Sequence, residues 1–398
     1  MSKGKHQTKK AAPIPKSNVI SLKDAKQIAS FRKTSKPKHN KQRENNSDGS
    51  PSIPTSPVQE PKGKDKGVKE LSGFPKLIKN LELFRDQQNQ PCAVRKDDLN
   101  REVFYVGTKP FKQLLEGLFY DEYGGIPTRP TLTDGIRLAE FKSIRGKSMK
   151  TIWKRFAFVD GTVYIDMNDG NGSVIVVNEE GYSIKQISET DIYFHRSPIS
   201  APLPTPISGG DYMSMFKPMN LKNQNDLCLV ATWPIVAVIP GIPKPPLMIY
   251  GPAGSTKSTM ALMIKNIIAP DAKEGLKIKN NEAEMAQILD KHAIPFFDNV
   301  TPVSQNIADL ICMAVTGGSF SKRKLYTDSD DVVFNLQKPI ITTSLGIWTS
   351  ASDLLDRCIF VELNPIDVSS RKDRASILHE YEAKRGQYLG GFLDALSR

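Results

Sequence analysis

The C-terminal half of the chain alternates short apolar runs with segments of helical periodicity. Apolar runs at residues 247–250, 293–297, 338–343 and 358–363 have the length of buried strands. A helical pattern over residues 258–268 follows the first run, and helix-like segments separate the others. Because strands that alternate with helices form a mainly parallel sheet covered on both faces, the pattern predicts an α/β domain.

Residues 71–210 carry a mixed pattern of helical spacing and strict alternation. Helices are expected over residues 76–86, 111–120 and 133–141, and strands over residues 102–107, 156–159, 162–167 and 173–178. The step Asp160-Gly161 between two of these strands is typical of a hairpin turn. We therefore expect a small α+β accessory domain, in which no catalytic constellation is evident.

Two segments join this accessory domain to the α/β domain. Residues 195–210 contain several prolines and end in two glycines, which is typical of a linker. Residues 225–239 form a strongly apolar helix candidate, and Pro234 is expected to kink or end it. The α/β domain is thus expected over residues 211–398, with a short helix at its C-terminus.

Charge is distributed unevenly along the chain. Residues 1–70 hold 17 Lys and Arg against 6 Asp and Glu, a net charge of +11, whereas the whole chain carries +12. This segment is rich in Lys, Ser, Pro and Asn and poor in aromatic residues, which predicts a disordered basic tail. Such a tail either binds polyanions through counterion release or serves as a solvated extension, and both readings stay open.

Composition also argues against several classes of protein. No apolar run reaches the roughly 18 residues that a membrane-spanning helix needs, and the N-terminus has no apolar signal region. The cysteines are far apart and form no CxxC pair, so neither a disulfide framework nor a zinc site is expected. The four cysteines are Cys92, Cys228, Cys312 and Cys358. A cytoplasmic location fits these observations.

A glycine-rich loop at residues 251–258 matches the phosphate-binding pattern G-x-x-x-x-G-K-[ST], except that Thr256 replaces the second Gly. Its backbone N–H groups would surround the β-phosphate of ATP, Lys257 would bridge the β- and γ-phosphates, and Ser258 would bind Mg²⁺. The stiff, β-branched Thr256 is expected to need a negative φ. The residues expected to bind ATP are Gly251, Pro252, Ala253, Gly254, Ser255, Thr256, Lys257, Ser258 and Thr259.

A carboxylate ends the apolar run that follows the loop. Asp298 directly follows Phe297, so this residue is expected to hold Mg²⁺ through its water shell. Asn299 stands where many ATPases place a second acid, and an amide can orient a water but is a poor base. We therefore expect either slow ATP hydrolysis or a general base supplied by another residue. Glu282 and Glu284 are the candidates for that base.

Two later residues are candidates for sensing or completing the site. Thr343, at the end of an apolar run, either contacts the γ-phosphate or the attacking water, or is ordinary strand content. Arg357 precedes the last strand and is interpreted as an arginine finger for a neighbouring subunit, worth about 10³–10⁵ in rate. The alternative for Arg357 is a surface contact with an acid of the same chain.

A glycine turn and a basic run occupy residues 316–326. Lys322 and Lys324 are candidates for contacts with DNA phosphates, and Tyr326 for stacking on a base. Arg323 is a candidate for the same contact or for action in trans on nucleotide. A plain basic turn is the alternative.

These motifs together resemble a known family. The sequences GPAGSTKST, FFDNV, LICMAVTGGSFSKRKLYTDSDDVVF, KPIITTS and SDLLDRCIFVEL are similar to those of phage- and mobile-element-encoded ATPases, described as helicase or primase–helicase ATP-binding proteins. That family is related to superfamily-three helicases of the AAA+ class, and the similarity covers roughly residues 80–395, including FVDGTVYIDMND.

The resemblance implies a P-loop ATPase that works as a ring of identical subunits on DNA. By match, Lys257, Ser258 and Asp298 form the ATP site and Arg357 stands at the finger position. Thr343 stands at the sensor position, where relatives tend to have Asn.

Two functions remain open from the sequence. The first is an ATP-hydrolysing motor on single-stranded or forked DNA, a helicase or replication-associated ATPase of a phage or mobile element, with replication proteins as further partners. The second is a nucleotide-controlled switch that acts on partner proteins. Asn299 would suit the slower turnover of the second.

Overall fold

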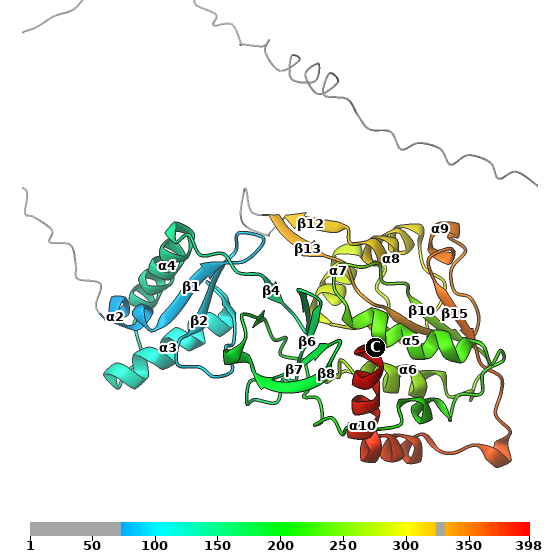
Figure 1. The fold of residues 1–398 in the computed structure, drawn as a ribbon. Helices are drawn as coiled ribbons and strands as arrows, with labels where there is room; N and C mark the ends of the chain where they lie inside the picture. The colour runs from blue at the N-terminus through cyan, green and yellow to red at the C-terminus, as the bar shows by residue number, and fades with distance from the viewer. Residues whose placement is uncertain (1–72, 324–330) are drawn as a thin grey trace, which may run out of the picture. The chain divides into compact units, whose positions relative to one another are not determined.

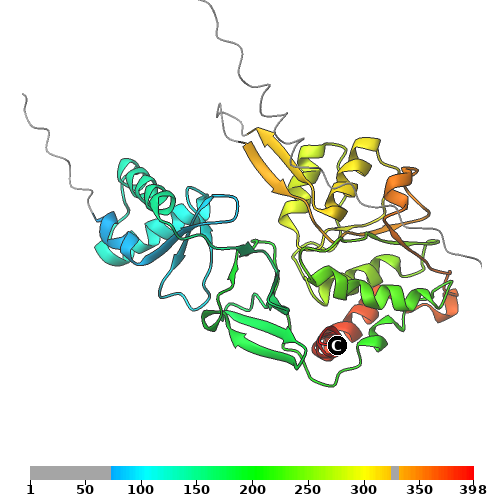
Figure 2. The ribbon, with the colours of Figure 1, turned by 45° about the horizontal axis from the view of Figure 1, so that its top comes forward.

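The computed structural model describes residues 73–323 and 331–398, and the side chains of residues 321–335 are not described. The basic tail expected at residues 1–70 therefore lies outside the described residues. Figures 1 and 2 show the helices and strands from two directions. No helix in the described ranges is both long and apolar enough to cross a membrane.

A four-stranded parallel sheet forms the centre of the C-terminal part. Its order is β11-β14-β10-β15, and every neighbouring pair is parallel. Leu247 of the inner strand β10 pairs with Ile341 of β14 and Ile359 of β15. The strands span Leu247–Tyr250 (β10), Phe296–Phe297 (β11), Ile341–Ser344 (β14) and Ile359–Glu362 (β15). The predicted α/β class with a parallel sheet is confirmed, although β11 is shorter than expected.

Helices cover both faces of this sheet (Figure 1). Leu247 and Ile249 of β10 share a buried cluster with residues of α5, α6 and α10. Met248, which points to the opposite face, packs with residues of α7, α8 and α9. The helices span Asp226–Val238 (α5), Lys257–Asn266 (α6), Glu282–Lys291 (α7), Gln305–Thr316 (α8), Ser352–Leu355 (α9) and Arg374–Leu396 (α10).

Pro234 does not end α5, because the helix continues for four residues to Val238. Of the two expected effects of Pro234, an end to the helix is contradicted, and a kink stays a prediction. Pro234 and the neighbouring Trp233 are buried, and the indole Nε1 of Trp233 donates to the carbonyl of Pro245 at 2.7 Å. At the C-terminus of α5, the ammonium of Lys244 donates to the carbonyls of Val236 and Ile239, which satisfies groups that a helix end leaves unpaired.

The N-terminal described residues form a three-stranded antiparallel sheet with helices packed on it. The sheet order is β1-β2-β3, and α4 contacts both β1 and β2. The strands span Leu81–Arg85 (β1), Pro91–Arg95 (β2) and Phe104–Tyr105 (β3), and the helices Phe74–Lys79 (α2), Lys109–Tyr123 (α3) and Arg129–Arg145 (α4). The helices predicted over residues 111–120 and 133–141 are thus present and longer than expected.

The single helix predicted over residues 76–86 was wrong. The helix ends at Lys79, and residues 81–85 form β1 instead. Leu81 and Phe84 sit in two different buried clusters. The spacing of Leu81 and Phe84 fits one face of a helix. Because β1 pairs with β2 instead, the two side chains are buried in different clusters.

A second antiparallel sheet has the order β5-β6-β7-β8. The predicted hairpin between β5 and β6 is confirmed: Val159 pairs with Thr162, and Asp160 and Gly161 take φ values of 49° and 75°. The strands span Phe156–Val159 (β5), Thr162–Asp166 (β6), Ser173–Asn178 (β7) and Gly181–Gln186 (β8), and a parallel pair joins Ile152–Trp153 (β4) to Tyr193–Phe194 (β9).

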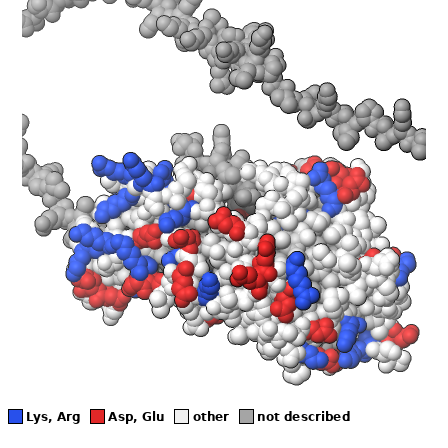
Figure 3. All heavy atoms as spheres, in the orientation of Figure 1, with Lys and Arg blue, Asp and Glu red and all other residues white. Residues whose placement is uncertain are grey.

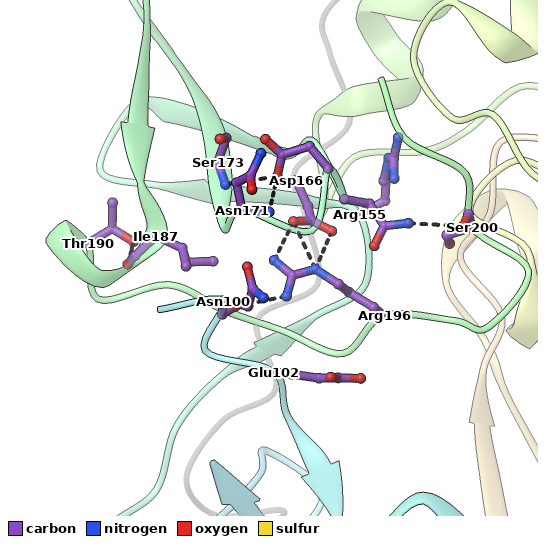
Figure 4. A network of polar contacts seen from close by, with 12 residues as sticks. Asn100, Glu102, Arg155, Asp166, Asn171, Ser173, Ile187, Thr190, Arg196 and Ser200 are labelled. Atoms are coloured by element: carbon purple, nitrogen blue, oxygen red, sulfur yellow. Dashed lines mark hydrogen bonds and ion pairs between the residues drawn. The ribbon is translucent and has the colours of Figure 1, made fainter. Parts of the chain in front are cut away.

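A buried ion pair ties this second sheet to the loop that precedes β3 (Figure 4). The guanidinium of Arg196 donates to the carboxylate of Asp166 at 2.7–3.1 Å and to the backbone carbonyl of Asn100 at 2.8 Å. Arg155 lies nearby in the same view, and burial lowers the pKa of its guanidinium to about 10. A buried charge pair of this kind is costly to break, because the remaining partner would stay buried and unpaired.

The stretch expected as a linker, residues 195–210, forms no helix or strand, but it packs closely on α10. The N–H of Ile207 donates to the carbonyl of Gly386 at 2.8 Å. A Cβ added to Gly390 would overlap the carbonyl oxygen of Ile207, so the close approach requires glycine there. One buried cluster also joins β6 and β7 to α10 across this stretch, and the division at residue 210 stays a prediction.

Candidate ATP and metal site

The glycine-rich loop connects the end of β10 to the start of α6. Gly251 and Gly254 have φ values of 148° and 77°, and the Cα of Gly251 faces the carbonyl oxygen of Leu363. Thr256 has φ 63° and ψ 10°, so the expectation of a negative φ was wrong. This left-handed conformation costs roughly 1–2 kcal/mol for a residue with a Cβ. The hydroxyl of Thr256 donates to the carbonyl of Ser255 at 2.7 Å, one local contact that accompanies the turn.

The side chain of Lys257 folds back over the loop. Its Nζ donates to the carbonyl of Pro252 at 2.6 Å and to the hydroxyl of Ser255 at 3.3 Å. Burial lowers the pKa of this ammonium, and the charge of Asp298 partly opposes the shift. Lys257 is therefore a partly desolvated cation held by one backbone carbonyl and one hydroxyl of the loop.

Ser258, Asp298 and Thr343 come together at the carboxyl edge of the parallel sheet. The hydroxyls of Ser258 and Thr343 both donate to Oδ1 of Asp298, at 2.6 Å and 2.5 Å. The sheet order brings these three side chains together, because β14, which carries Thr343, lies between β10 and β11. Thr259 follows Ser258 in α6 and is buried.

Asn299, next to Asp298, takes a left-handed backbone conformation with φ 53°. Its N–H donates to the hydroxyl oxygen of Thr343 at 3.0 Å. Glu282 and Glu284 lie in the first turn of α7, and within the described ranges neither carboxylate forms a hydrogen bond or ion pair with Asp298 or Asn299. The structure thus gathers the hydroxyls and Asp298, but does not join the two candidate bases to them.

Arg371 is a cation at the loop that the sequence interpretation missed. It lies between the short helix Val368–Ser370 (η4) and α10, and a Cβ added to Gly254 would overlap its guanidinium. Its Nη2 donates weakly to the carbonyl of Ile366 at 3.4 Å. The only signal in the sequence is the basic run at residues 371–374, which matches no motif.

Arg357 lies between α9 and β15 and points to the surface. Its guanidinium donates to Oδ1 of Asp353 from Nε at 3.2 Å and from Nη2 at 2.9 Å. The surface pair that was the alternative interpretation is therefore present. Within one chain Arg357 does not bond to the Asp298 cluster, so its role as a finger stays a prediction about a neighbouring subunit.

The basic run falls on a two-stranded hairpin after α8. The strands Ser319–Arg323 (β12) and Asp331–Asn335 (β13) are antiparallel, with Lys322 opposite Val332 and Arg323 opposite Asp331. Gly317 ends α8 with φ 96° and begins the turn into this hairpin. Lys324 and Tyr326 lie outside the described residues, and the predicted DNA contacts stay predictions.

Comparison with known proteins identifies a related family for the second half of the chain. Residues 213–398 match the family described as "Actinomycete integrative conjugative element replication protein". The resemblance to proteins of mobile elements is thereby confirmed for these residues. No curated protein matches the chain.

Solved structures, two of which are described as helicases, also align with this chain. The apo C-terminal region of NrS-1 aligns with 14% identity over 82% of this chain and 70% of its own, at a TM-score of 0.46. The active helicase Cch of SCCmec type IV aligns with 12% identity over 78% of this chain and 57% of its own, at 0.39. JCV helicase aligns with 17% identity over 46% and 52%, at 0.29.

Proposed function

Because residues 213–398 match a family of mobile-element replication proteins, we propose that this chain is an ATP-hydrolysing motor that acts on DNA during replication of such an element. The observation that carries the proposal is the hydrogen-bonded group of Ser258, Asp298 and Thr343 beside the glycine-rich loop. A hydroxyl, a carboxylate and a loop at the carboxyl edge of a parallel sheet are the parts of a P-loop ATPase of the AAA+ class.

ATP would bind with its phosphates in the loop at the start of α6. The backbone N–H groups there and the positive end of the helix dipole favour an anion. Lys257 now bonds to Pro252 and Ser255, and both acceptors are groups of the loop itself. Phosphate oxygens would replace them, and the stronger charge-assisted bonds favour this exchange.

Ser258 and Asp298 fit a Mg²⁺ ion. Their oxygens lie 2.6 Å apart, so both face the same point next to the loop. The described residues contain no group of three or more His, Cys, Asp and Glu side chains suited to a metal. A site with one hydroxyl and one carboxylate suits Mg²⁺, which keeps water and phosphate oxygens as its other ligands and neutralises phosphate charge.

Hydrolysis would depend on Thr343 and Asn299 to place the attacking water and on arginines to stabilise negative charge. Arg371 stands against Gly254 of the same chain and would reach the phosphates in cis. Arg357, on the surface between α9 and β15, would reach the nucleotide of the next subunit in a ring. In such a ring, each ATP site would be complete only at the contact between two subunits.

DNA would be contacted by Lys322 and Arg323 of β12 and by Lys324, which follows them in the sequence. The competing function, a nucleotide-controlled switch that acts on proteins, is favoured by one observation. Asn299 supplies no carboxylate, and the candidate bases Glu282 and Glu284 are not bonded to the cluster. Slow hydrolysis would suit a switch.

The steady-state ATPase rate with and without single-stranded DNA separates the two functions. The chain lacking residues 1–70 is used beside the full chain, so that attraction to the basic tail does not imitate a specific effect. Stimulation by DNA, abolished by Lys257→Ala, would support the motor. ATP binding without stimulation would favour the switch, and hydrolysis that survives Lys257→Ala would overturn the site assignment.

A further inference from the structure

The outward face of α4 carries exposed cations mixed with exposed apolar side chains. Phe141 and Ile144 expose 55% and 53% of their surface, and the guanidinium of Arg145 lies 5.6 Å from the ring centre of Phe141. We call this face the α4 surface. It consists of Arg129, Arg137, Phe141, Lys142, Ile144, Arg145 and the following Lys147, all of them exposed.

The α4 surface concentrates positive charge in an otherwise nearly neutral body. Residues 129–150 hold six Lys and Arg against Asp134 and Glu140, a net charge of +4. Residues 71–398 together carry only +1, because they hold 38 Lys and Arg against 37 acids. Outside residues 129–150 that body is therefore net negative, at −3. Figure 3 shows Lys and Arg side chains gathered over the region of α4.

Among the residues that the structure describes, the cations of this surface form no ion pair with an acid. Within the described ranges, no ion pair involves Arg129, Arg137, Lys142, Arg145 or Lys147. Some cations elsewhere on the surface are paired, as in Lys222 with Glu362 at 2.9 Å. Unpaired cations in a row leave a positive potential that attracts a polyanion.

The fold holds α4 in place from its other face. A Cβ on Gly135 would overlap the ring of Phe74, and Ala139 is fully buried in the same cluster. The side chain of Thr128 caps the N-terminus, and Pro130 occupies the first turn. Since these contacts fix the helix, the exposed cations are free to serve a partner rather than the fold.

We propose that the α4 surface is a second DNA-binding surface, separate from the ATP site. Arg137 and Arg145, two turns apart, would bind phosphates, and Phe141 between them would contact a sugar or base. An α-helix also fits the major groove of duplex DNA. The inference deepens the proposed function, on which it rests, by adding DNA contact outside residues 213–398, the part that matches the replication family.

The distribution of side chains favours nucleic acid over a membrane surface. A membrane-bound helix presents one broad apolar face, whereas the apolar face of α4 is buried against Phe74 and its cluster. On the exposed face, Phe141 and Ile144 alternate with cations. Phosphates spaced along a strand match such an arrangement.

The test compares the full chain with two double variants that lose the same charge. Arg137→Gln with Arg145→Gln removes two cations of the α4 surface, and Lys185→Gln with Lys384→Gln removes two exposed cations of β8 and α10. Affinity for labelled duplex and single-stranded DNA is measured by anisotropy at several salt concentrations. For duplex DNA the slope of log affinity against log salt should fall by roughly 0.9 per lost phosphate contact, about 1.8 for the α4 variant.

The control variant should keep the slope of the unaltered chain. ATPase activity without DNA should be unchanged in both variants, because none of the four residues touches the ATP site. Phe141→Ala should weaken binding without changing the salt slope, which separates stacking from charge. If the α4 variant loses more affinity for duplex than for single-stranded DNA, α4 binds in a groove of the duplex. If it loses more affinity for single-stranded DNA, a single strand runs across α4.

Equal affinities and slopes for the two double variants would overturn the proposal. So would unchanged DNA binding together with a specific loss of binding to vesicles of anionic phospholipid. If the unaltered chain does not hydrolyse ATP, the proposed motor function is wrong. The test of the α4 surface would still be valid, because the variants are compared by DNA affinity alone.

Discussion

The hydroxyl of Thr343 donates a hydrogen bond of 2.5 Å to Oδ1 of Asp298, and its oxygen accepts one of 3.0 Å from the N–H of Asn299. One buried hydroxyl thus holds both the carboxylate that we propose as a Mg²⁺ ligand and the backbone of the next residue. Thr343 is 1% exposed, so no bulk water is available to replace these bonds. We therefore expect Thr343 to position Asp298 and Asn299 in the proposed site.

Thr343→Val should lower kcat by at least tenfold while leaving ATP affinity within a few-fold. Valine keeps the shape of the side chain but leaves the N–H of Asn299 unpaired, which costs about 1–3 kcal/mol when buried. Thr343→Ser is the control, because it retains the hydroxyl and should recover most of the rate. If the valine variant hydrolyses ATP at the normal rate, the positioning role is wrong.

Arg371→Ala should weaken ATP binding more than ADP binding. The guanidinium lies against Gly254 and would contact the terminal phosphate, and charge-assisted hydrogen bonds of this kind contribute about 1.5–3 kcal/mol. Equilibrium titration with fluorescent nucleotide analogues measures the difference. Lys372→Ala is the matched control, since Lys372 pairs instead with Glu380 at 2.8 Å. Equal losses for both variants would mean that only general charge attraction is at work.

Arg357→Ala should abolish hydrolysis without reducing nucleotide binding, if the residue acts on the neighbouring subunit. Mixing it with Lys257→Ala subunits should restore part of the activity, because some contacts then combine an intact Lys257 with an intact Arg357. Asp353→Ala serves as control, since it removes the partner of Arg357 and should leave hydrolysis intact. Inactivity of the mixture in well-exchanged oligomers would argue against the finger.

The residues at the ends of the central strands could be predicted from the sequence, because apolar runs that end in polar groups mark the carboxyl edge of a parallel sheet. Asp298 and Thr343 were expected there, Ser258 was expected from the glycine-rich loop pattern, and the structure joins all three. Arg371 could not be predicted in this way. Its approach to Gly254 depends on where the segment before α10 crosses the loop, which no local pattern encodes.

The errors also have physical causes. The φ of Thr256 is set within the folded loop and not by side-chain preference alone; the carbonyl oxygen of Pro218, distant in sequence, lies 3.3 Å from its hydroxyl. Residues 81–85 have apolar spacing that suits a helix and a strand equally, and pairing with residues 91–95 decides between them. Tertiary contacts overrode local preference in both places.

Lys338→Met should stabilise the protein at neutral pH. Lys338 is 9% exposed, and burial, reinforced by the charge of Lys154 and opposed by Asp290, lowers the pKa of its ammonium from 10.5 to about 7. Between pH 7 and 10.5 the unfolded chain therefore binds more protons at this site than the folded chain, so stability should rise with pH across that window. Below pH 7 both states are protonated and the cost of burying the charge is constant.

Methionine is close to lysine in shape and carries no charge. The Lys338→Met variant should therefore lack the contribution of Lys338 to the rise of stability with pH. Part of the rise should remain, because burial also lowers the pKa of Lys244 to about 8. Urea unfolding at pH 7 and pH 9 measures both effects, with Lys185→Met, at an exposed position of β8, as control. If Lys338→Met gains no stability at pH 7 over that control, the folded protein already accommodates the charged ammonium without cost.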